Sequence, residues 1–162
     1  MDDQNIRARS LTGGRWEWAL ANSESSSFTV RVVNFPEQAQ LCVGFSFLSL
    51  PIINAQELDR QSWLLMKNLM GRICLVTRGR KTTHINRVMA PIKEGSIISV
   101  QKDHMGWKVL YFSIHGQHLT DTIGAPVGWQ ATHLEDANQF ESLVGIIELW
   151  GEGIEVEIFN HN

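Results

Sequence analysis

The feature that most constrains the fold of this chain is a two-residue alternation of apolar and polar side chains in several short segments. Successive side chains of a β-strand point to opposite faces of its sheet, so this period is that of a strand with one buried face. Turn-forming residues separate the segments, and no strand–helix–strand pattern occurs. The alternation therefore predicts an all-β fold, an antiparallel sandwich or barrel. The apolar rows are Phe28, Val30 and Val32; Leu41, Val43, Phe45 and Phe47; Leu110, Phe112 and Ile114; and Ile154, Val156 and Ile158.

Two segments also fit a helix. In residues 54–71, Asn54 followed three residues later by Glu57 can cap the N-terminus of a helix, and Gly71 can end it. A loop through Arg60 followed by a strand around residues 63–67 fits the same segment. Residues 134–147 carry a weaker helical pattern. Periodicity does not decide either case.

A chain of 162 residues has the length of one domain. We expect a single β-sandwich domain over residues 1–162, with residues 1–12 as an N-terminal extension. Trp16 and Trp18 share a strand face, so one sheet would have to cover both. The large side chains expected in the core are Trp16, Trp18, Phe45, Trp63, Phe112, Ile114 and Val156.

The sequence also indicates where the protein resides. The longest apolar stretch, residues 41–53, is interrupted by glycine, serine and proline and falls short of the roughly 20 residues that a membrane span needs. The first ten residues, MDDQNIRARS, lack the apolar core of a secretory signal. Two cysteines and no Asn-x-Ser/Thr site fit a reducing compartment. We therefore expect a cytoplasmic protein, with the nucleus as the alternative and no membrane partner.

Opposite charges are concentrated in two parts of the chain. Residues 60–108 contain ten Lys or Arg and two acidic residues, whereas residues 111–162 contain eight Asp or Glu and no Lys or Arg. This polarity is typical either of a nucleic-acid-binding face or of two segments that pair within one domain; the second interpretation is the simpler one. Aromatic residues for stacking on bases are missing between Arg72 and Lys93. We do not predict nucleic-acid binding.

Six segments, taken in order, carry a resemblance to a known group of β-sandwiches. They are GGRWEWAL at 13–20, LCVGFS at 41–46, SWLLMKN at 62–68, KEGSIISV at 93–100, WKVLYFSIHG at 107–116 and IIELWGEGIEVEI at 146–158. Together they resemble the concanavalin-like sandwich of SPRY domains, a group that includes the Neuralized homology repeats, over residues 13–159. The resemblance implies an all-β fold, an antiparallel two-sheet β-sandwich of the jelly-roll kind. Ser96, Ser99 and His115 depart from the usual Asp, Gly and Asn. The Asn normally takes a left-handed turn conformation, which His tolerates better than most residues.

The SPRY resemblance implies a function as well as a fold. Such domains are non-catalytic modules that bind a partner protein through loops at one rim, often as substrate-recognition subunits of ubiquitin ligases or as scaffolds. They need no cofactor. This chain contains no RING, F-box or SOCS-like segment, so a link to a ligase would come from other chains.

A second resemblance is to galectins. IHGQHLTD at residues 114–121 is similar to their N-G-Q-H-L hairpin. The galectin sugar site also needs H-x-N-x-R on one strand, and an Asn, a Trp and a Glu before this hairpin. Here HINR at residues 84–87 is one residue shorter than the H-x-N-x-R motif. The W-G pair at residues 150–151 follows the hairpin instead of preceding it. Carbohydrate binding, or a galectin fold without a sugar site, is therefore the alternative function.

The sequence predicts no catalytic residue, metal or cofactor. It contains no P-loop, G-x-G-x-x-G or H-E-x-x-H motif. Cys42 and Ser46 lie in an apolar strand without a nucleophile elbow. His115 and His118 have a chelating spacing with Asp121 nearby, but a turn followed by a strand rarely presents both imidazoles to one point. Glu155 and Glu157 are expected on the solvent face of one strand, where nothing pairs them as acid and base.

Partner-binding residues are expected in connections, because strand residues are committed to packing. Three connections carry suitable side chains, at residues 52–61, 78–87 and 124–133. Trp129 is the predicted anchor, unless it plugs the edge of the sandwich instead, and the basic residues would steer an acidic peptide or domain. The predicted partner-binding site consists of Trp129, Arg78, Arg80, Lys81, His84 and Arg60.

Overall fold

The computed structural model describes residues 6–21, 27–46, 62–67, 73–77, 81–84, 92–103, 109–119, 128–130 and 143–161. The regular elements in these residues are all β-strands, which form two antiparallel sheets. Sheet A contains β1 (Ile6–Arg9), β3 (Ser27–Asn34), β8 (Ile97–Asp103), β9 (Val109–Ile114), β10 (Gln117–His118), β11 (Gly128–Gln130) and β13 (Glu155–His161). Sheet B contains β2 (Trp16–Leu20), β4 (Gln40–Ser46), β5 (Ser62–Lys67), β6 (Ile73–Thr77), β7 (Lys81–His84) and β12 (Val144–Trp150).

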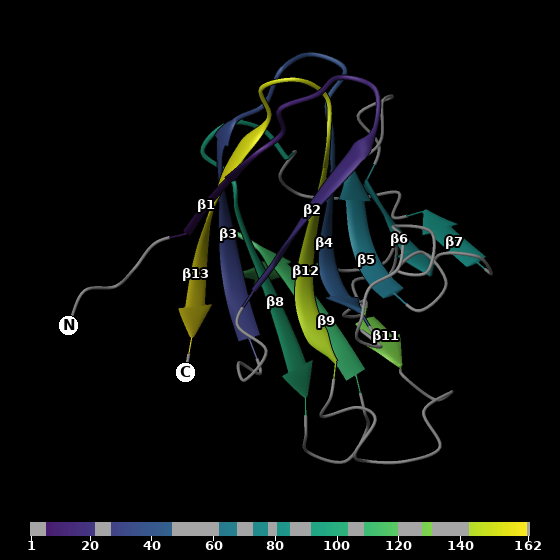
Figure 1. Cartoon of the computed structure of the whole chain (residues 1–162). Coiled ribbons are helices and arrows are strands. Elements are labelled where there is room, and N and C mark those ends of the chain that lie inside the picture. Colours follow the sequence, from purple (N-terminus) through teal and green to yellow (C-terminus); the bar gives the residue numbers. More distant parts are fainter. Residues whose placement is uncertain are drawn as a thin grey trace.

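The two sheets face each other as the layers of a sandwich (Figure 1). The strand order is β1-β13-β3-β8-β9 in sheet A, with both β10 and β11 paired to β9, and β2-β12-β4-β5-β6-β7 in sheet B. Figure 1 shows both layers running in the same direction, from β13 to β11 and from β12 to β7. As a result, β7 and β11 lie at one lateral side of the sandwich in Figure 1, and β1 and β2 are the terminal strands at the opposite ends of the two strand orders.

The main core fills the space between the sheets. The apolar rows predicted from the alternation are buried there, including Phe45, Phe112, Ile114 and Val156, each at most 2% exposed. Phe28 of β3 and Phe45 of β4 meet edge to face, with ring centroids 5.6 Å apart. This contact joins the centre of sheet A to the centre of sheet B. Phe47 and the side chain of Trp63 lie outside the described part of the chain.

Sheet B also buries side chains on its outer face. Cys42, Leu64 and Ile146 form a second apolar cluster, and Trp16, Leu20 and Met66 pack against it while staying partly exposed. This explains why β4 is buried at nearly every position instead of at alternate ones. Burial raises the pKa of the free thiol of Cys74, whose strand position lies opposite Met66 on the same face.

The prediction that Trp16 and Trp18 lie in the core between the sheets is wrong. Trp16 packs against the outer-face cluster of sheet B and stays partly exposed. Trp18 is 38% exposed. Its neighbour Ala19 takes the inward position on β2 and packs against the main core. Because β2 is the last strand of sheet B, a large side chain on its outer face has a neighbouring strand on one side only.

The two segments that also fitted a helix form strands in the residues that the structure describes. Residues 62–67 form β5, so the strand interpretation of that segment is confirmed, while residues 54–61 lie outside the described ranges. Residues 144–150 form β12 and are not helical. Residues 6–9, within the expected N-terminal extension, form β1 and pair with β13. His115 has the expected left-handed conformation, with φ of 51°, and Gly116 follows it at 77°.

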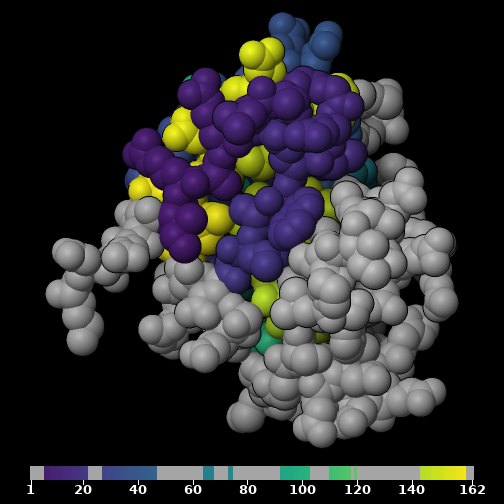
Figure 2. Space-filling view, in the orientation of Figure 1, coloured from purple at the N-terminus to yellow at the C-terminus, as the bar shows by residue number. Residues whose placement is uncertain are grey.

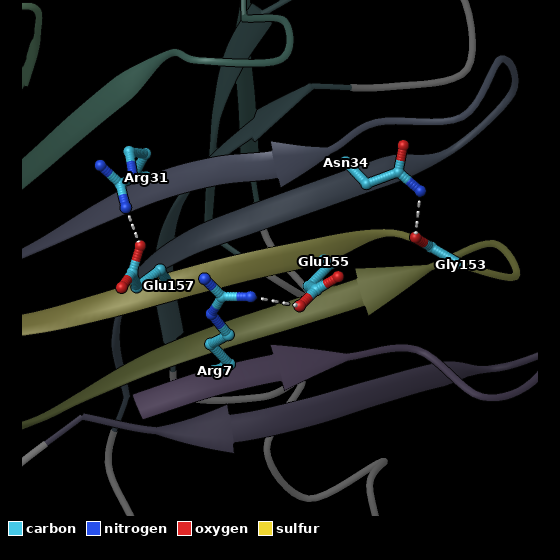
Figure 3. A network of polar contacts seen from close by, with 6 residues as sticks. All are labelled: Arg7, Arg31, Asn34, Gly153, Glu155 and Glu157. Carbon is cyan, nitrogen blue, oxygen red and sulfur yellow. Dashed lines mark hydrogen bonds and ion pairs between the residues drawn. The ribbon is translucent and has the colours of Figure 1, made fainter. Parts of the chain in front are cut away.

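Polar contacts tie the outer face of sheet A together (Figure 3). Arg31 of β3 forms an ion pair with Glu157 of the adjacent strand, and Arg7 of β1 forms one with Glu155 at 3.6 Å. The Asn34 amide donates a hydrogen bond to the carbonyl of Gly153, at 2.7 Å. Both carboxylates lie on the face predicted for them, but the Glu157 side chain is only 6% exposed. The expectation that Glu157 is solvated is therefore wrong, because Arg31 pairs with it and covers it.

Two lysines of the basic segment, residues 60–108, make contacts inside the sandwich. Lys102 of β8 is 4% exposed and donates to the carbonyl of Leu143, at 3.1 Å. Its Nζ also lies 5.4 Å from the centroid of the Phe45 ring, on the opposite sheet. Lys67 of β5 donates to the carbonyl of Ile92, and its Nζ lies 4.1 Å from the Phe35 ring. Burial lowers the pKa of Lys67. These lysines therefore connect the two sheets.

Candidate partner-binding site

Two of the predicted site residues lie on the last strand of sheet B. Lys81 and His84 begin and end β7, and their backbone partners on β6 are Thr77 and Cys74. The sequence assigned this segment to a connection, but its central threonines are β-branched and favour a strand. Lys81 and His84 are three residues apart on the strand, so their positions belong to opposite faces of the sheet. Arg60, Arg78 and Arg80 lie outside the described residues.

Trp129 also lies on a strand at a sheet boundary. It is the middle residue of β11, opposite Leu110 of β9. Its neighbours Gly128 and Gln130 pair with Tyr111 and Val109. The backbone of Trp129 is thus held by sheet A and does not belong to an open loop. The orientation of its side chain lies outside what the structure describes, so its predicted role as an anchor stays a prediction.

The strand order brings these positions to the same side of the sandwich. Sheet B ends at β7, and sheet A ends at β10 and β11, both of which pair with β9. In Figure 1, β7 and β11 both lie on the right. We call this the β7/β11 side; it contains Lys81 and His84 from one sheet and Trp129 from the other.

A second group of candidate residues was missed by the sequence reasoning. Trp16, Trp18 and Trp150, which we call the tryptophan cluster, lie on the outer face of sheet B on the neighbouring strands β2 and β12. Trp150 pairs with Trp16, and Glu148 pairs with Trp18. All three tryptophans are at least partly exposed, whereas Glu148 is 3% exposed. The two-residue spacing in W-E-W and in E-L-W was a visible signal, but the register that joins the two strands was not.

Three carboxylates and one arginine lie on β2 and on the turns beside the tryptophan cluster. Glu17 accepts a hydrogen bond from the Leu11 amide at 2.7 Å and lies 3.9 Å from Arg15. The side chain of Ser10 and then the Leu11 amide hold the pKa of Glu17 below its usual value by hydrogen bonding to its carboxylate. Glu37 and Glu152 are exposed on two further turns.

The described residues also bear on membrane insertion and on metal binding. They contain no helix that is long and apolar enough to cross a membrane. Within the same ranges, no three His, Cys, Asp or Glu side chains are grouped so that they could hold a metal ion.

Comparison with known proteins identifies the fold. No family model matches the sequence, and no curated protein does either. Among solved structures, the chain is similar to the SPRY domain of human HERC1, with a TM-score of 0.60 and 16% identity over 93% of this chain and 86% of that one. It is similar to another human SPRY domain with a TM-score of 0.60 and 14% identity, over 98% of this chain and 92% of that one. Chicken galectin 2 gives a TM-score of 0.45 and 8% identity, over 87% and 96% of the two chains. The two-sheet sandwich of this chain is therefore the SPRY fold that its six sequence segments predicted.

Proposed function

We propose that this chain is a non-catalytic protein-interaction domain that binds an acidic peptide or domain at its β7/β11 side. The observation that carries the proposal is the strand order. Lys81 and His84 belong to the last strand of sheet B, and Trp129 belongs to a last strand of sheet A at the same side. Residues on terminal strands have a neighbouring strand on one side only, and so they are available to a partner.

The proposed roles follow from the side-chain chemistry. Trp129 is the anchor, because tryptophan combines a large apolar area with a hydrogen-bond donor and is enriched at interface hot spots. Arg78, Arg80 and Lys81 steer an acidic partner by long-range attraction. His84 and Arg60 add polar contacts at the rim. In the cytoplasm or nucleus, the domain would act as a substrate-recognition or scaffold subunit, a role that the SPRY fold supports.

The Trp129→Ala variant tests this proposal. We expect it to lose the partner that the wild-type domain captures from cell lysate, while the free energy of unfolding changes by less than about 1 kcal/mol. Captured proteins are identified and quantified by mass spectrometry, and stability is measured by urea titration. Trp129→Phe is the matched control, because it keeps an aromatic ring. Capture that is undiminished in Trp129→Ala, or unfolding of that variant, would remove Trp129 from the site.

A second variant tests the proposed electrostatic role of the basic residues. In the variant Arg78→Glu/Arg80→Glu/Lys81→Glu, capture of the same partner should fall, and so should its dependence on salt, since exposed charges are screened by added ions. Equal capture by this variant and by the wild type at low salt would contradict the steering role.

Galactoside binding is the competing function, and a thermal melt separates the two. We expect millimolar lactose to leave the melting temperature of the domain unchanged, because a ligand stabilises a protein only by binding its native state. Glucose at the same concentration controls for a general effect of sugar. A reproducible rise of several degrees with lactose alone would favour the galectin-like function instead.

A further inference from the structure

The edge of sheet A at β1 is a surface that the proposed function does not use. The strand order ends there, because β1 pairs with β13 and with no other strand among the described residues. Ile6 is 46% exposed, and Arg7 and Arg9 are exposed as well. In Figure 2, N-terminal residues (purple) lie at the molecular surface, beside C-terminal residues (yellow). The edge of β1 is therefore accessible to a partner.

Two residues of β1 have backbone polar groups that point away from the sheet. Successive residues of an antiparallel strand form their hydrogen bonds alternately on one side of the strand and on the other. The Ser10 amide donates to the carbonyl of Ile154, which precedes β13, at 2.9 Å. Two residues earlier, Ala8 therefore also bonds to β13. The N–H and C=O groups of Arg7 and Arg9 then point outward, where an added strand would meet them.

Hydrogen bonds further into sheet A give the same alternation. The amide of Val32 donates to the carbonyl that precedes β8, at 2.9 Å, so its neighbour Arg31 bonds on the other side, to its partner Glu157 of β13. The adjacent residue Val156 then bonds to β1, where its partner is Ala8. An added antiparallel strand can thus exchange both backbone hydrogen bonds with each outward-pointing residue of β1.

The side chains of the same two residues give this edge a positive charge. Arg7 and Arg9 share the outer face of sheet A with Glu155, Glu157 and Arg31. Arg31 pairs with Glu157, and Arg7 pairs with Glu155 but stays 60% exposed. Arg9 forms no ion pair with any described residue. An added strand would lie about 4.8 Å from β1 and twice as far from β13, so its side chains would be closer to the arginines than to the glutamates.

The pairing on the other side of β1 shows which side chains suit this strand. There β13 places Glu-Val-Glu-Ile, residues 155–158, opposite residues 9 to 6 of β1. The two glutamates adjoin the arginines on the outer face. The two apolar side chains adjoin Ala8, which packs against the main core, and Ile6 on the inner face. A segment with the same alternation would bring acidic groups to the arginines at the free edge and would cover the exposed Ile6.

A second copy of this chain is a poor match for the edge. If two β1 strands paired antiparallel about a two-fold axis, Arg7 would lie opposite Arg9 of the other copy, or one arginine would lie opposite its own equivalent. Like charges directly opposite each other destabilise a strand pair. Charged side chains on edge strands also protect proteins from such self-association. The edge therefore favours a different chain of opposite charge.

We infer that the edge of β1 binds an extended segment of a partner protein as an additional antiparallel strand. The segment has acidic residues opposite Arg7 and Arg9 and an apolar residue between them. Backbone hydrogen bonds supply the affinity, and the two arginines select the charge and the register. This site is independent of the proposed function, because it uses no residue of the β7/β11 side and recognises the backbone of its partner.

Backbone NMR of the ¹⁵N-labelled protein tests the inference, with the peptide Ac-Gly-Glu-Val-Glu-Ile-Gly-NH2 as the probe. Without peptide, the amides of Arg7 and Arg9 should exchange with heavy water faster than that of Ala8, because only Ala8 is bonded to β13. Titration should shift the two arginine amides saturably and slow their exchange. The indole signal of Trp129 should stay unchanged.

Four altered peptides separate backbone pairing from charge. N-methylation of both glutamates should abolish binding, since it removes the N–H groups that donate to the arginine carbonyls. N-methylation of the valine is the matched control and should be tolerated, because that N–H points away from β1. Replacing both glutamates with glutamine, or rearranging the peptide to Ac-Gly-Glu-Glu-Val-Ile-Gly-NH2, should weaken binding. The rearranged peptide has the same composition and charge without the alternation.

Variants of the protein test the two arginines. Arg7→Gln/Arg9→Gln should weaken binding of the probe by about three- to tenfold. Arg15→Gln is the matched control, because the Arg15 side chain is 73% exposed and lies outside β1; it should bind as the wild type does. Trp129→Ala should also leave this binding intact, so failure of the proposed function would not affect it. If the double variant loses the slow exchange of Ala8, the two N-methylated peptides decide the outcome.

Several results would overturn the inference. Equal binding of the probe and of its glutamate-methylated form would show that no strand is added. Equal binding of the glutamine and rearranged peptides would show that the edge selects neither charge nor alternation. Unchanged arginine amides at millimolar probe would exclude the site. Shifts of the same amides on dilution without peptide would show that a second copy of the chain occupies the edge.

Discussion

Replacing Phe112 with alanine is expected to lower the free energy of unfolding by about 3–5 kcal/mol. Phe112 is fully buried near the middle of β9. It lies opposite Val100 of β8 and shares its face with Leu110 and Ile114, all of which are buried. Removing the ring takes away its burial and leaves a cavity that the flanking strands of sheet A cannot close.

Urea titration measures this loss, and Ser113→Ala provides the control. Ser113 is the next residue on the same strand but is only partly buried, on the other face of the sheet, and we expect a change of less than about 1 kcal/mol there. A loss below about 1 kcal/mol for Phe112→Ala would show that β9 does not line the centre of the core.

Gly145→Val is expected to have an effect of similar size through the opposite cause, overpacking. A Cβ atom at Gly145 would lie 2.6 Å from Cε1 of Phe28 and 2.8 Å from Cβ of Ala21. Phe28 has no room to move aside, because it is 1% exposed and packs edge to face on Phe45. Overpacking of a dense core commonly costs about 1–3 kcal/mol, and we expect Gly145→Ala within this range and Gly145→Val above it.

Gly14→Ala is the matched control, since a Cβ atom there would meet nothing within 4 Å. It should change the melting temperature little, whereas both Gly145 variants should lower it markedly in differential scanning calorimetry. A Gly145→Val variant as stable as Gly14→Ala would mean that the two sheets are further apart at this point than the Phe28 contact indicates.

The sequence predicted the inward-facing rows well, and the reason is physical. Along β3 and β9 the main core takes one face and partly or fully exposed residues take the other, so alternation and burial coincide. Sheet B departs from this rule, because Cys42, Leu64 and Ile146 are buried on its outer face. A period of two says which residues share a face, but not whether a second layer covers it. Trp18 was therefore assigned to the core although it lies at an exposed edge.

The candidate sites were harder to predict, because they depend on pairing between distant segments. Lys81 and Trp129 looked like residues of connections because glycine, proline and charged residues surround them, yet each lies on a strand that pairs with another. The tryptophan cluster depends on the register of β2 against β12, where Trp16 lies opposite Trp150. A shift of one residue in that register would place these side chains on opposite faces, and local sequence does not specify it.

The strand order also determines when the molecule can be completed during synthesis. Both N-terminal strands pair with C-terminal ones, β1 with β13 and β2 with β12. At ribosomal rates, about 10 s therefore pass between the synthesis of Trp16 and Trp18 and the synthesis of β12, the strand with which theirs pairs. Closing such long loops slows folding, and an unpaired strand that bears two large aromatic rings is open to intermolecular pairing in the meantime. The nascent chain should consequently depend on chaperones that cover its first 20 residues, and production of the soluble protein should improve when translation is fast relative to aggregation.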